Sequence, residues 1–223
     1  MAADVQPLFP LPGVVARCVP MAATATGLLP EEHADVASAP AARQRAFATG
    51  RGLVRRLLAE LGHGPHALPI GPRGAPRWPA GVVGALAHTD ALCAAVVAQR
   101  GPVLALGIDL EEPGPVSDDL LQLVARAEER EWIAAAPGHA RERRARLLFS
   151  AKESFFKCQG DAEQLRLTHH DVRVVFAAGQ RSFVATRLGG LPPGAIGTAR
   201  GFCSDSGPVL ATGITVTDCA TVT

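Results

Sequence analysis

The chain has 223 residues, of which 48% are hydrophobic and 19% charged. This composition suffices for one large domain or two packed halves, and it excludes a disordered chain. A net charge of +1, with 8 Phe, 2 Trp and no Tyr, argues against nucleic-acid binding and against attachment to a membrane surface. No apolar run approaches the roughly 18 residues that a membrane span needs.

Five scattered cysteines form neither a disulfide framework nor a CxxC metal pair. The N-terminus carries Asp4 and prolines at positions 7, 10 and 12, whereas a signal peptide has a basic start and an unbroken apolar stretch. We therefore expect a cytoplasmic protein with reduced thiols.

Taken in chain order, the patterns predict alternating groups of helices and strands. Residues 1–27 are rich in Pro, Ala and Gly and predict a strand followed by a loop. Two helical stretches follow from Pro30, the second over about 41–61, and a Gly- and Pro-rich loop occupies 63–81. The remaining predictions are two adjacent buried strands joined by a tight turn (91–99 and 103–111), helices over 117–136 and 140–159, and strands over 167–176, 181–188, 195–202 and 208–216.

Helices thus precede strands twice along the chain. This order permits a structural duplication and predicts an α+β fold, in which helices pack on antiparallel sheets. We expect two similar α/β halves, an N-terminal half over 1–101 and a C-terminal half over 102–223.

Two acids end one of the predicted buried strands. Asp109 and Glu111 are two residues apart, so both carboxylates lie on the same face of the strand. Two close negative charges favour a hard cation such as Mg²⁺, which takes oxygen ligands. The alternative is a strand that runs into an acidic surface turn.

Lysine is almost absent from the chain. Only Lys152 and Lys157 occur among 22 basic residues, both within the segment FSAKESFFK, which suggests that Arg will not serve there. Glu153 and Lys157 are four residues apart and share one helix face, where Glu153 is available as a third metal ligand. An ordinary helix salt bridge is the alternative.

Cationic residues upstream are candidates for binding phosphates. Arg43 and Arg51 recur on one side of the second helix, and the loop PRGAPRWP adds further Arg side chains. His88 stands just before a buried strand and is either a structural or a ligand-binding residue. Taken singly, each Arg is equally a solvated surface residue.

Five motifs in this order resemble the 4′-phosphopantetheinyl transferases, specifically the large monomeric class of the surfactin-synthetase-activating and enterobactin-synthesis types. They are Gly50-Arg51, PRGAPRWP (72–79), GALAHT (84–89), GIDLE (107–111) and FSAKESFFK (149–157). The last two resemble the two family signatures and lie about 40 residues apart. The resemblance covers residues 43–157 and implies a monomer with a pseudo-two-fold α+β fold.

The resemblance also implies roles for individual residues. Asp109, Glu111 and Glu153 would bind Mg²⁺, with Mn²⁺ as an alternative, and Glu153 would otherwise act as the general base. Lys157 would be catalytic and would contact the phosphates of coenzyme A. The coenzyme A site would comprise Arg43, Arg51, Arg73, Gly74, Ala75, Pro76, Ala87, His88, Asp109 and Lys157. His88 would contact the ribose 3′-phosphate. Ala87 replaces the hydroxyl residue that usually precedes this histidine, so the hydroxyl's contact to that phosphate falls to His88, Thr89 or the backbone.

The implied reaction transfers 4′-phosphopantetheine from coenzyme A to a serine of an apo acyl or peptidyl carrier protein, for example in secondary-metabolite biosynthesis. It releases 3′,5′-ADP. The C-terminal half would dock the carrier, and Arg141, Arg143, Arg144 and Arg146 are candidates for a basic patch there, or else form a solvated helix face. Two alternatives remain open: a Mg²⁺-dependent phosphohydrolase of coenzyme A-like pyrophosphates, and a silent protein that binds coenzyme A or a carrier.

Overall fold

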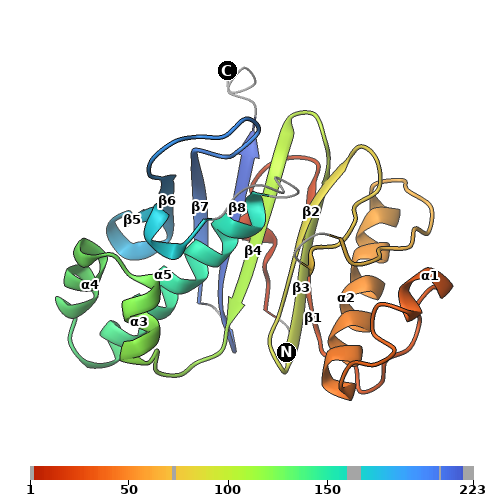
Figure 1. Cartoon of the computed structure of the whole chain (residues 1–223), viewed down its shortest axis with the longest axis horizontal. Coiled ribbons are helices and arrows are strands. Elements are labelled where there is room, and N and C mark those ends of the chain that lie inside the picture. The colour runs from red at the N-terminus through yellow and green to blue at the C-terminus, as the bar shows by residue number, and fades with distance from the viewer. Residues whose placement is uncertain (1–2, 72–73, 160–166, 206, 218–223) are drawn as a thin grey trace.

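A computed structural model describes residues 3–71, 74–159, 167–205 and 207–217. Two antiparallel sheets form the centre of the molecule, with helices on both outer sides (Figure 1). The three-stranded sheet has the order β1-β3-β2, and the five-stranded sheet has the order β4-β8-β7-β6-β5. This architecture confirms the predicted α+β fold.

The elements follow one another along the chain in two groups. The first group comprises η1 (Gln6–Leu8), β1 (Val14–Pro20), α1 (Pro30–His33), α2 (Ala41–Glu60), β2 (Val82–His88) and β3 (Leu92–Gln99). The second comprises β4 (Val103–Glu111), α3 (Asp118–Val124), α4 (Ala127–Ala134), α5 (Gly138–Cys158), η3 (His169–Asp171), β5 (Val172–Phe176), η4 (Ala178–Gln180), β6 (Ser182–Arg187), β7 (Thr198–Ser204) and β8 (Leu210–Thr217). Among the described residues, no helix is both long and apolar enough to cross a membrane.

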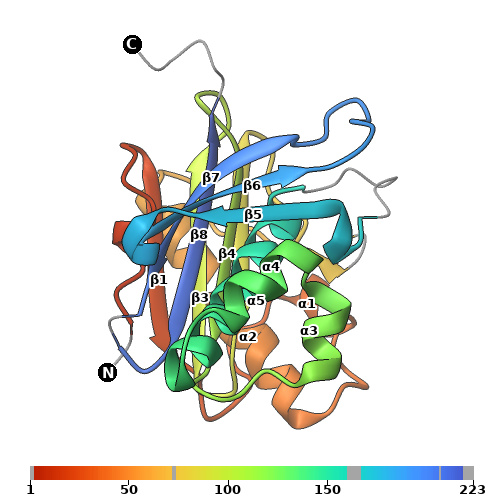
Figure 2. The same cartoon turned by 90° about the vertical axis from the view of Figure 1, so that its left-hand side faces the viewer.

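The two sheets share a connection pattern. In each, the first strand pairs with the last strand, which pairs in turn with the strand before it: β1-β3-β2 corresponds to β4-β8-β7. A long helix follows the first strand in both cases, α2 in one and α5 in the other. The five-stranded sheet adds β5 and β6, which run across the direction of β4 and β8 because the sheet is strongly twisted (Figure 2).

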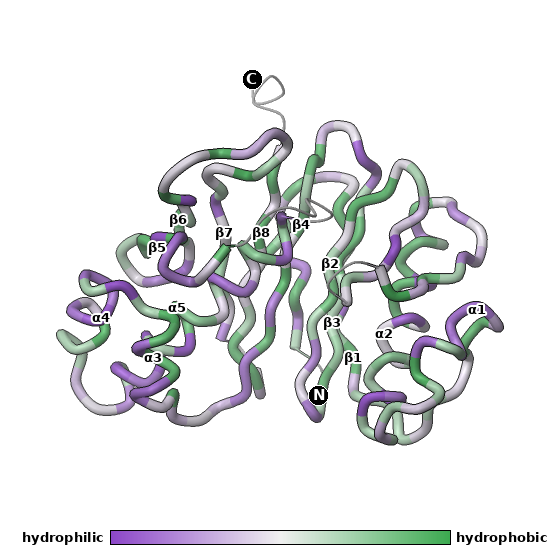
Figure 3. Tube along the Cα trace, in the orientation of Figure 1, coloured by the Kyte–Doolittle hydropathy of each residue, from purple (hydrophilic) through white to green (hydrophobic). Residues whose placement is uncertain are grey.

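Three hydrophobic clusters hold these layers together. One lies between the sheets and takes alternate residues of β2 from Val83 to Ala87 and of β4 from Leu106 to Leu110. The second joins α2 to the outer face of the three-stranded sheet, and the third joins the helices α3–α5 to the five-stranded sheet. Hydrophobic stretches follow the central strands accordingly, whereas the peripheral helices α3 and α4 mix hydrophilic and hydrophobic residues (Figure 3).

One predicted strand pairing is wrong. Residues 91–99 and 103–111 do form strands joined by a short turn, but β3 and β4 are not neighbours within one sheet. Both edges of β3 are taken, one by β1 and the other by β2, so β4 pairs with β8 instead. The strand β2 was absent from the prediction because its sequence, VVGALAH, is rich in Gly and Ala.

Two helical predictions also need correction. The first helical stretch is only the single turn α1, which gives way to turns before Pro40. The stretch 117–136 is two helices, because the backbone is extended at Ala125 and Arg126. The helix predicted over 140–159 is α5.

We expect the packing of α5 on β4 to tolerate no side chain at Gly107. A Cβ there would lie 2.0 Å from the Ser154 carbonyl oxygen and 2.7 Å from Cys158 Sγ. Gly107→Ala should therefore lower the free energy of unfolding by about 1–3 kcal/mol, measured by denaturant or thermal unfolding.

Gly52→Ala is the matched control for this substitution. Gly52 lies in α2, and its Cβ would meet nothing within 4 Å. Because Ala has a higher helix propensity than Gly, the control should be neutral or stabilising by up to about 1 kcal/mol. Equal stabilities of the two variants would contradict the close approach of α5 to β4.

Candidate functional site

Two acids lie at the end of β4 on the face that α5 covers. Asp109 is 6% exposed, and its Oδ1 accepts a hydrogen bond of 2.7 Å from Lys157 Nζ. Its other oxygen, Oδ2, is buried and has no hydrogen-bond partner among the described residues. Such an orphaned carboxylate oxygen is costly unless a donor or a cation reaches it.

Glu111 shares this face, as the two-residue spacing predicts. Its pKa is raised to about 8, chiefly by burial and then by the negative charge of Asp109. Lys157 opposes this shift, and Glu153 adds to it. Glu111, Asp109 and Glu153 therefore interact electrostatically, and at neutral pH the group cannot carry three negative charges without compensation.

Glu153 and Lys157 do not pair with each other. Glu153 Oε1 lies 2.9 Å from His169 Nε2, whereas Lys157 reaches across to Asp109. The alternative prediction of a salt bridge within one helix is therefore wrong. The two side chains connect α5 to two different neighbours, His169 and Asp109.

The two lysines have separate functions in the structure. Lys152 is fully buried, and its Nζ donates to Glu129 Oε2 at 2.6 Å and to the carbonyl oxygens of Val124 and His169, each at 2.8 Å. Three acceptors around one ammonium suit Lys, whose donors rotate, and not the planar fork of Arg. Lys152 is thus structural, whereas Lys157 is a half-buried cation at the acid cluster.

The cationic candidates lie partly together. His88 is the exposed last residue of β2, and its pKa is lowered first by partial desolvation of the ring and then by the positive charges of Arg43 and Lys157. These three residues therefore share one electropositive region. Arg43 is exposed on α2.

Arg51 differs from Arg43 because it is only 4% exposed. It lies over the Phe47 ring at 4.0 Å and donates through Nε to the Leu68 carbonyl oxygen at 2.5 Å. Burial lowers its pKa to about 10. Its Nη2 is buried without a partner among the described residues. The guanidinium of Arg51 therefore binds the backbone at Leu68 through Nε, while Nη2 remains without an acceptor there.

The predicted coenzyme A loop is only partly described. Arg73 lies outside the described residues. Gly74 has φ +82 and, with Ala75 and Pro76, forms a turn closed by the Gly71 amide, which donates to the Ala75 carbonyl oxygen at 2.7 Å. Ala87 is buried between the sheets, so only its backbone is available to a ligand.

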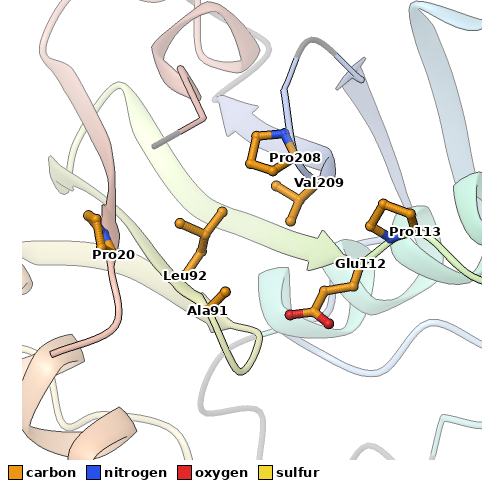
Figure 4. Close-up of a pocket in the computed structure, with 7 residues that line it drawn as sticks. All are labelled: Pro20, Ala91, Leu92, Glu112, Pro113, Pro208 and Val209. Carbon is orange, nitrogen blue, oxygen red and sulfur yellow. The ribbon is translucent and has the colours of Figure 1, made fainter. Parts of the chain in front are cut away.

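A cavity of about 570 Å³ lies beside the end of β4, between the two groups of elements. It is lined by Pro20, Ala91, Leu92, Glu112, Pro113, Pro208 and Val209 (Figure 4). Its walls are mostly apolar, and Glu112, which follows Glu111 in the sequence, is the charged residue among those that line it. Residues from both sheets line the cavity, whereas Asp109, Glu111 and Glu153 are not among its lining residues.

The described residues contain no group of three or more His, Cys, Asp and Glu side chains arranged to hold a metal ion. Lys157 and His169 occupy one oxygen of Asp109 and one of Glu153. Two features nevertheless fit a divalent cation: the buried Oδ2 of Asp109, which has no partner among the described residues, and the raised pKa of Glu111. A cation would coordinate the free oxygen and would favour the ionised form of Glu111.

The basic helix segment is largely engaged within the chain. Arg143 pairs with Asp205 at 2.7 Å, Arg144 lies over Trp132, and Arg146 donates to the Glu112 carbonyl oxygen. Arg141 is exposed and lies 4.0 Å from Asp118. Of these four arginines, only Arg141 therefore offers a largely exposed guanidinium to a partner.

Sequence reasoning missed His169 and the buried Glu129–Lys152 pair. Glu129 lies inside the helix predicted over 117–136 and in the first turn of α4 in the structure, and nothing in the sequence signalled that its side chain is buried. The scarcity of lysine pointed to Lys152 without revealing its partner. His169 carried one available signal, its place in a His-His pair inside the strand predicted over 167–176, which in the structure begins only at Val172.

Fold and site together define a two-halved α+β protein with a carboxylate cluster next to cationic groups suited to a phosphorylated ligand. Residues 31–98 match the sequence model of the 4′-phosphopantetheinyl transferase N-terminal domain, and residues 105–197 match that of the 4′-phosphopantetheinyl transferase superfamily. The chain belongs to the 4′-phosphopantetheinyl transferase superfamily.

Three curated relatives carry the same description. The 4′-phosphopantetheinyl transferase Svp of Streptomyces mobaraensis is 40% identical over 162 residues, 72% of this chain and 66% of that protein. Npt of Nocardia iowensis is 41% identical over 57% of this chain and 56% of its own length, and PptT of Mycobacterium tuberculosis is 32% identical over 66% and 65%. The matched region thus spans about two thirds or less of each relative's length. Neither the phosphohydrolase nor the silent binder finds support in these comparisons.

The acid pair makes the stability of the metal-free protein depend on pH. Because the pKa of Glu111 is raised from 4.5 to about 8, its stabilising contribution is complete below the unfolded value and is lost as pH rises through about 8. In EDTA, Glu111→Gln should gain in melting temperature relative to the native chain between pH 5 and 9. We expect about 2–4 °C, since partial exposure attenuates the effect to about 1 kcal/mol.

Glu112→Gln is the control, because Glu112 is the exposed neighbour of Glu111. Its melting temperature should follow that of the native chain at every pH. A difference between Glu111→Gln and the native chain that stays constant with pH would contradict the raised pKa.

Proposed function

We propose that this chain transfers the 4′-phosphopantetheine group of coenzyme A to a serine hydroxyl of an apo acyl or peptidyl carrier protein. The observation that carries the proposal is the interaction of Asp109, Glu111 and Glu153 with one another and with Lys157 in a chain of this family. Carriers of secondary-metabolite biosynthesis are included among the acceptors.

In the proposed reaction, the serine Oγ attacks the β-phosphorus of coenzyme A, and the bond from that phosphorus to the bridging oxygen breaks. Phosphopantetheine becomes esterified to serine, and 3′,5′-ADP leaves with the bridging oxygen. Glu153 takes the serine proton, because its carboxylate lies half-buried at the site and accepts only one hydrogen bond from the described residues, through Oε1.

The cationic groups bind and orient the nucleotide. Lys157 holds Asp109 in place and offers its remaining ammonium hydrogens to the departing phosphate. Arg43 and His88 extend the same electropositive region and would contact the phosphates of the nucleotide. Arg51 supports the loop over 68–76 through the Leu68 carbonyl oxygen, and Arg73, Gly74, Ala75, Pro76 and the backbone of Ala87 complete the proposed coenzyme A site.

We further propose that Asp109, Glu111 and Glu153 hold Mg²⁺ or Mn²⁺. When bound, the cation would neutralise negative charge on the pyrophosphate. The free Asp109 Oδ2 and the raised pKa of Glu111 support this proposal, because both are relieved by a cation.

The remaining proposals concern organisation and location. Residues 1–101 would supply cationic groups for coenzyme A, and residues 102–223 would supply the acids and dock the carrier. The chain would act as a monomer in the cytoplasm, where the free thiols of Cys18, Cys93, Cys158 and Cys203 would stay reduced.

Intact-mass measurement of an apo carrier incubated with this protein, coenzyme A and Mg²⁺ tests the reaction. The carrier should gain one phosphopantetheine, and EDTA should abolish the gain. Glu153→Ala should lower the rate by about 10²–10⁴-fold, as expected when a general base is removed.

Glu142→Ala is the matched control, because Glu142 is an exposed acid on the same helix. It should transfer at the native rate. Coenzyme A consumed without modification of any carrier, or bound without being consumed, would refute the transfer.

Lys157→Arg tests whether a compact ammonium is required beside Asp109. The planar guanidinium is longer and cannot hold the 2.7 Å contact while pointing other donors at the leaving phosphate. We expect kcat/KM to fall about 10- to 100-fold, about 1.4–2.7 kcal/mol in the activation free energy.

Arg173→Lys is the reciprocal control, because it exchanges the same residue types at an exposed position of β5, outside the proposed site. Its kcat/KM should be unchanged. Native activity of Lys157→Arg would show that any positive charge at this position suffices.

A further inference from the structure

His169 makes a contact with Glu153 that no motif accounts for. Its Nε2 lies 2.9 Å from Glu153 Oε1, and the two residues are 16 positions apart. The side chains are 23% and 29% exposed, so the pair is open to solvent on one side and is not a buried core ion pair. An ionised carboxylate only accepts hydrogen bonds, so the imidazole must donate through Nε2.

The imidazole is held on two sides by the aromatic residues of α5. The Phe156 ring meets it edge-on with 4.7 Å between the centroids, and the Phe149 ring lies nearly parallel to it at 6.2 Å. Phe149 and Phe156 lie four residues before and three residues after Glu153, on the same helix face. Glu153 therefore lies between the two rings that orient its partner.

The backbone of His169 is fixed as well. Its carbonyl oxygen accepts a 2.8 Å hydrogen bond from the buried Lys152, which pairs with Glu129 at 2.6 Å. The turn η3 is closed by Asp171, whose carboxylate accepts from the Thr168 amide at 2.8 Å. Both the ring and the main chain of His169 are thus held before any ligand arrives.

We propose that His169 is a positioning residue that holds the carboxylate of Glu153 through Oε1. The hydrogen bonds of the described residues to Glu153 involve only Oε1, so this contact orients Oε2 for the serine proton or for the cation. The catalytic consequence rests on the function proposed above. The buried Lys152 next to Glu153 acts on the same assembly, because it fixes the His169 main chain.

The test compares His169→Leu with His169→Gln. Leu has a similar size but no donor, whereas the Gln amide nitrogen takes the position of Nε2 and can donate to Glu153. His169→Leu should lower kcat about 10- to 100-fold, the usual effect of removing a group that orients a catalytic carboxylate, with the KM for coenzyme A changed less than about threefold. His169→Gln should recover most of this loss.

His170→Leu is the matched control. His170 is the exposed neighbour, and its Nε2 contacts the Gln122 carbonyl oxygen instead of the acid cluster. Its kcat should stay native. Native kcat of His169→Leu would overturn the proposal, and so would a joint change in kcat, KM and melting temperature that His169→Gln fails to recover, because this pattern marks a merely structural residue.

A measurement without turnover separates this proposal from the proposed function. In nitrogen-15 spectra of the histidine rings in the native chain, His169 should carry its proton on Nε2, and Glu153→Ala should change this signature while Glu142→Ala does not. A native chain that transfers nothing but keeps the signature would refute the transferase function alone. A His169 ring indifferent to Glu153→Ala would refute the positioning.

Discussion

The close approach of α5 to β4 is the constraint on which the site depends. Because Gly107 has no side chain, the Ser154 carbonyl oxygen comes to within 2.0 Å of the place where a Cβ would be. Because the helix lies so close to the strand, Lys157, three residues after Ser154, reaches Asp109, the next residue after Gly107 on the strand face that α5 covers. Thr212, the partner of Asp109 in β8, bonds to Ser154 on the same interface. The helix α5, the strand β4 and Asp109 are therefore packed as one unit, and this packing sets the geometry of the site.

The charges of the site favour a ligand over the stability of the empty protein. Within the described part of the chain, Asp109 keeps one buried oxygen without a donor and Arg51 keeps one buried nitrogen without an acceptor. The pKa of Glu111 is raised to about 8. Each of these groups destabilises the chain without ligand, because a buried polar atom loses its hydrogen bonds to water and here gains no bond from the described residues in exchange. The phosphorylated ligand and cation proposed above would supply what these groups lack. Unsatisfied charges of this kind are a common feature of functional sites and are rarely kept in a purely structural core.

Local patterns in the sequence predicted the parts of the site that depend on local geometry. The two-residue spacing placed Asp109 and Glu111 on one face, and the four-residue spacing placed Glu153 and Lys157 on one helix face, since strand and helix periods are local properties. Their partners were not predictable in the same way. The pairing of β4 with β8 joins segments about 100 residues apart, and the contact between Glu153 and His169 joins two residues 16 positions apart. Such contacts depend on tertiary packing, which a single sequence does not encode in any short window.

The internal similarity of the sheets explains why the site lies where it does. The orders β1-β3-β2 and β4-β8-β7 follow one plan, with α2 and α5 in corresponding positions after the first strand. The two helices have diverged in chemistry: α2 carries Arg43 and Arg51, whereas α5 carries Glu153 and Lys157. His88 and Arg43 therefore come from the first repeat, whereas the acids and Lys157 come from the second, and the effect of Lys157 on the pKa of His88 shows that groups of the two repeats interact across the boundary between them. Neither repeat alone has both sets of groups, so the transfer proposed above would need both halves and the packing of the two sheets against each other.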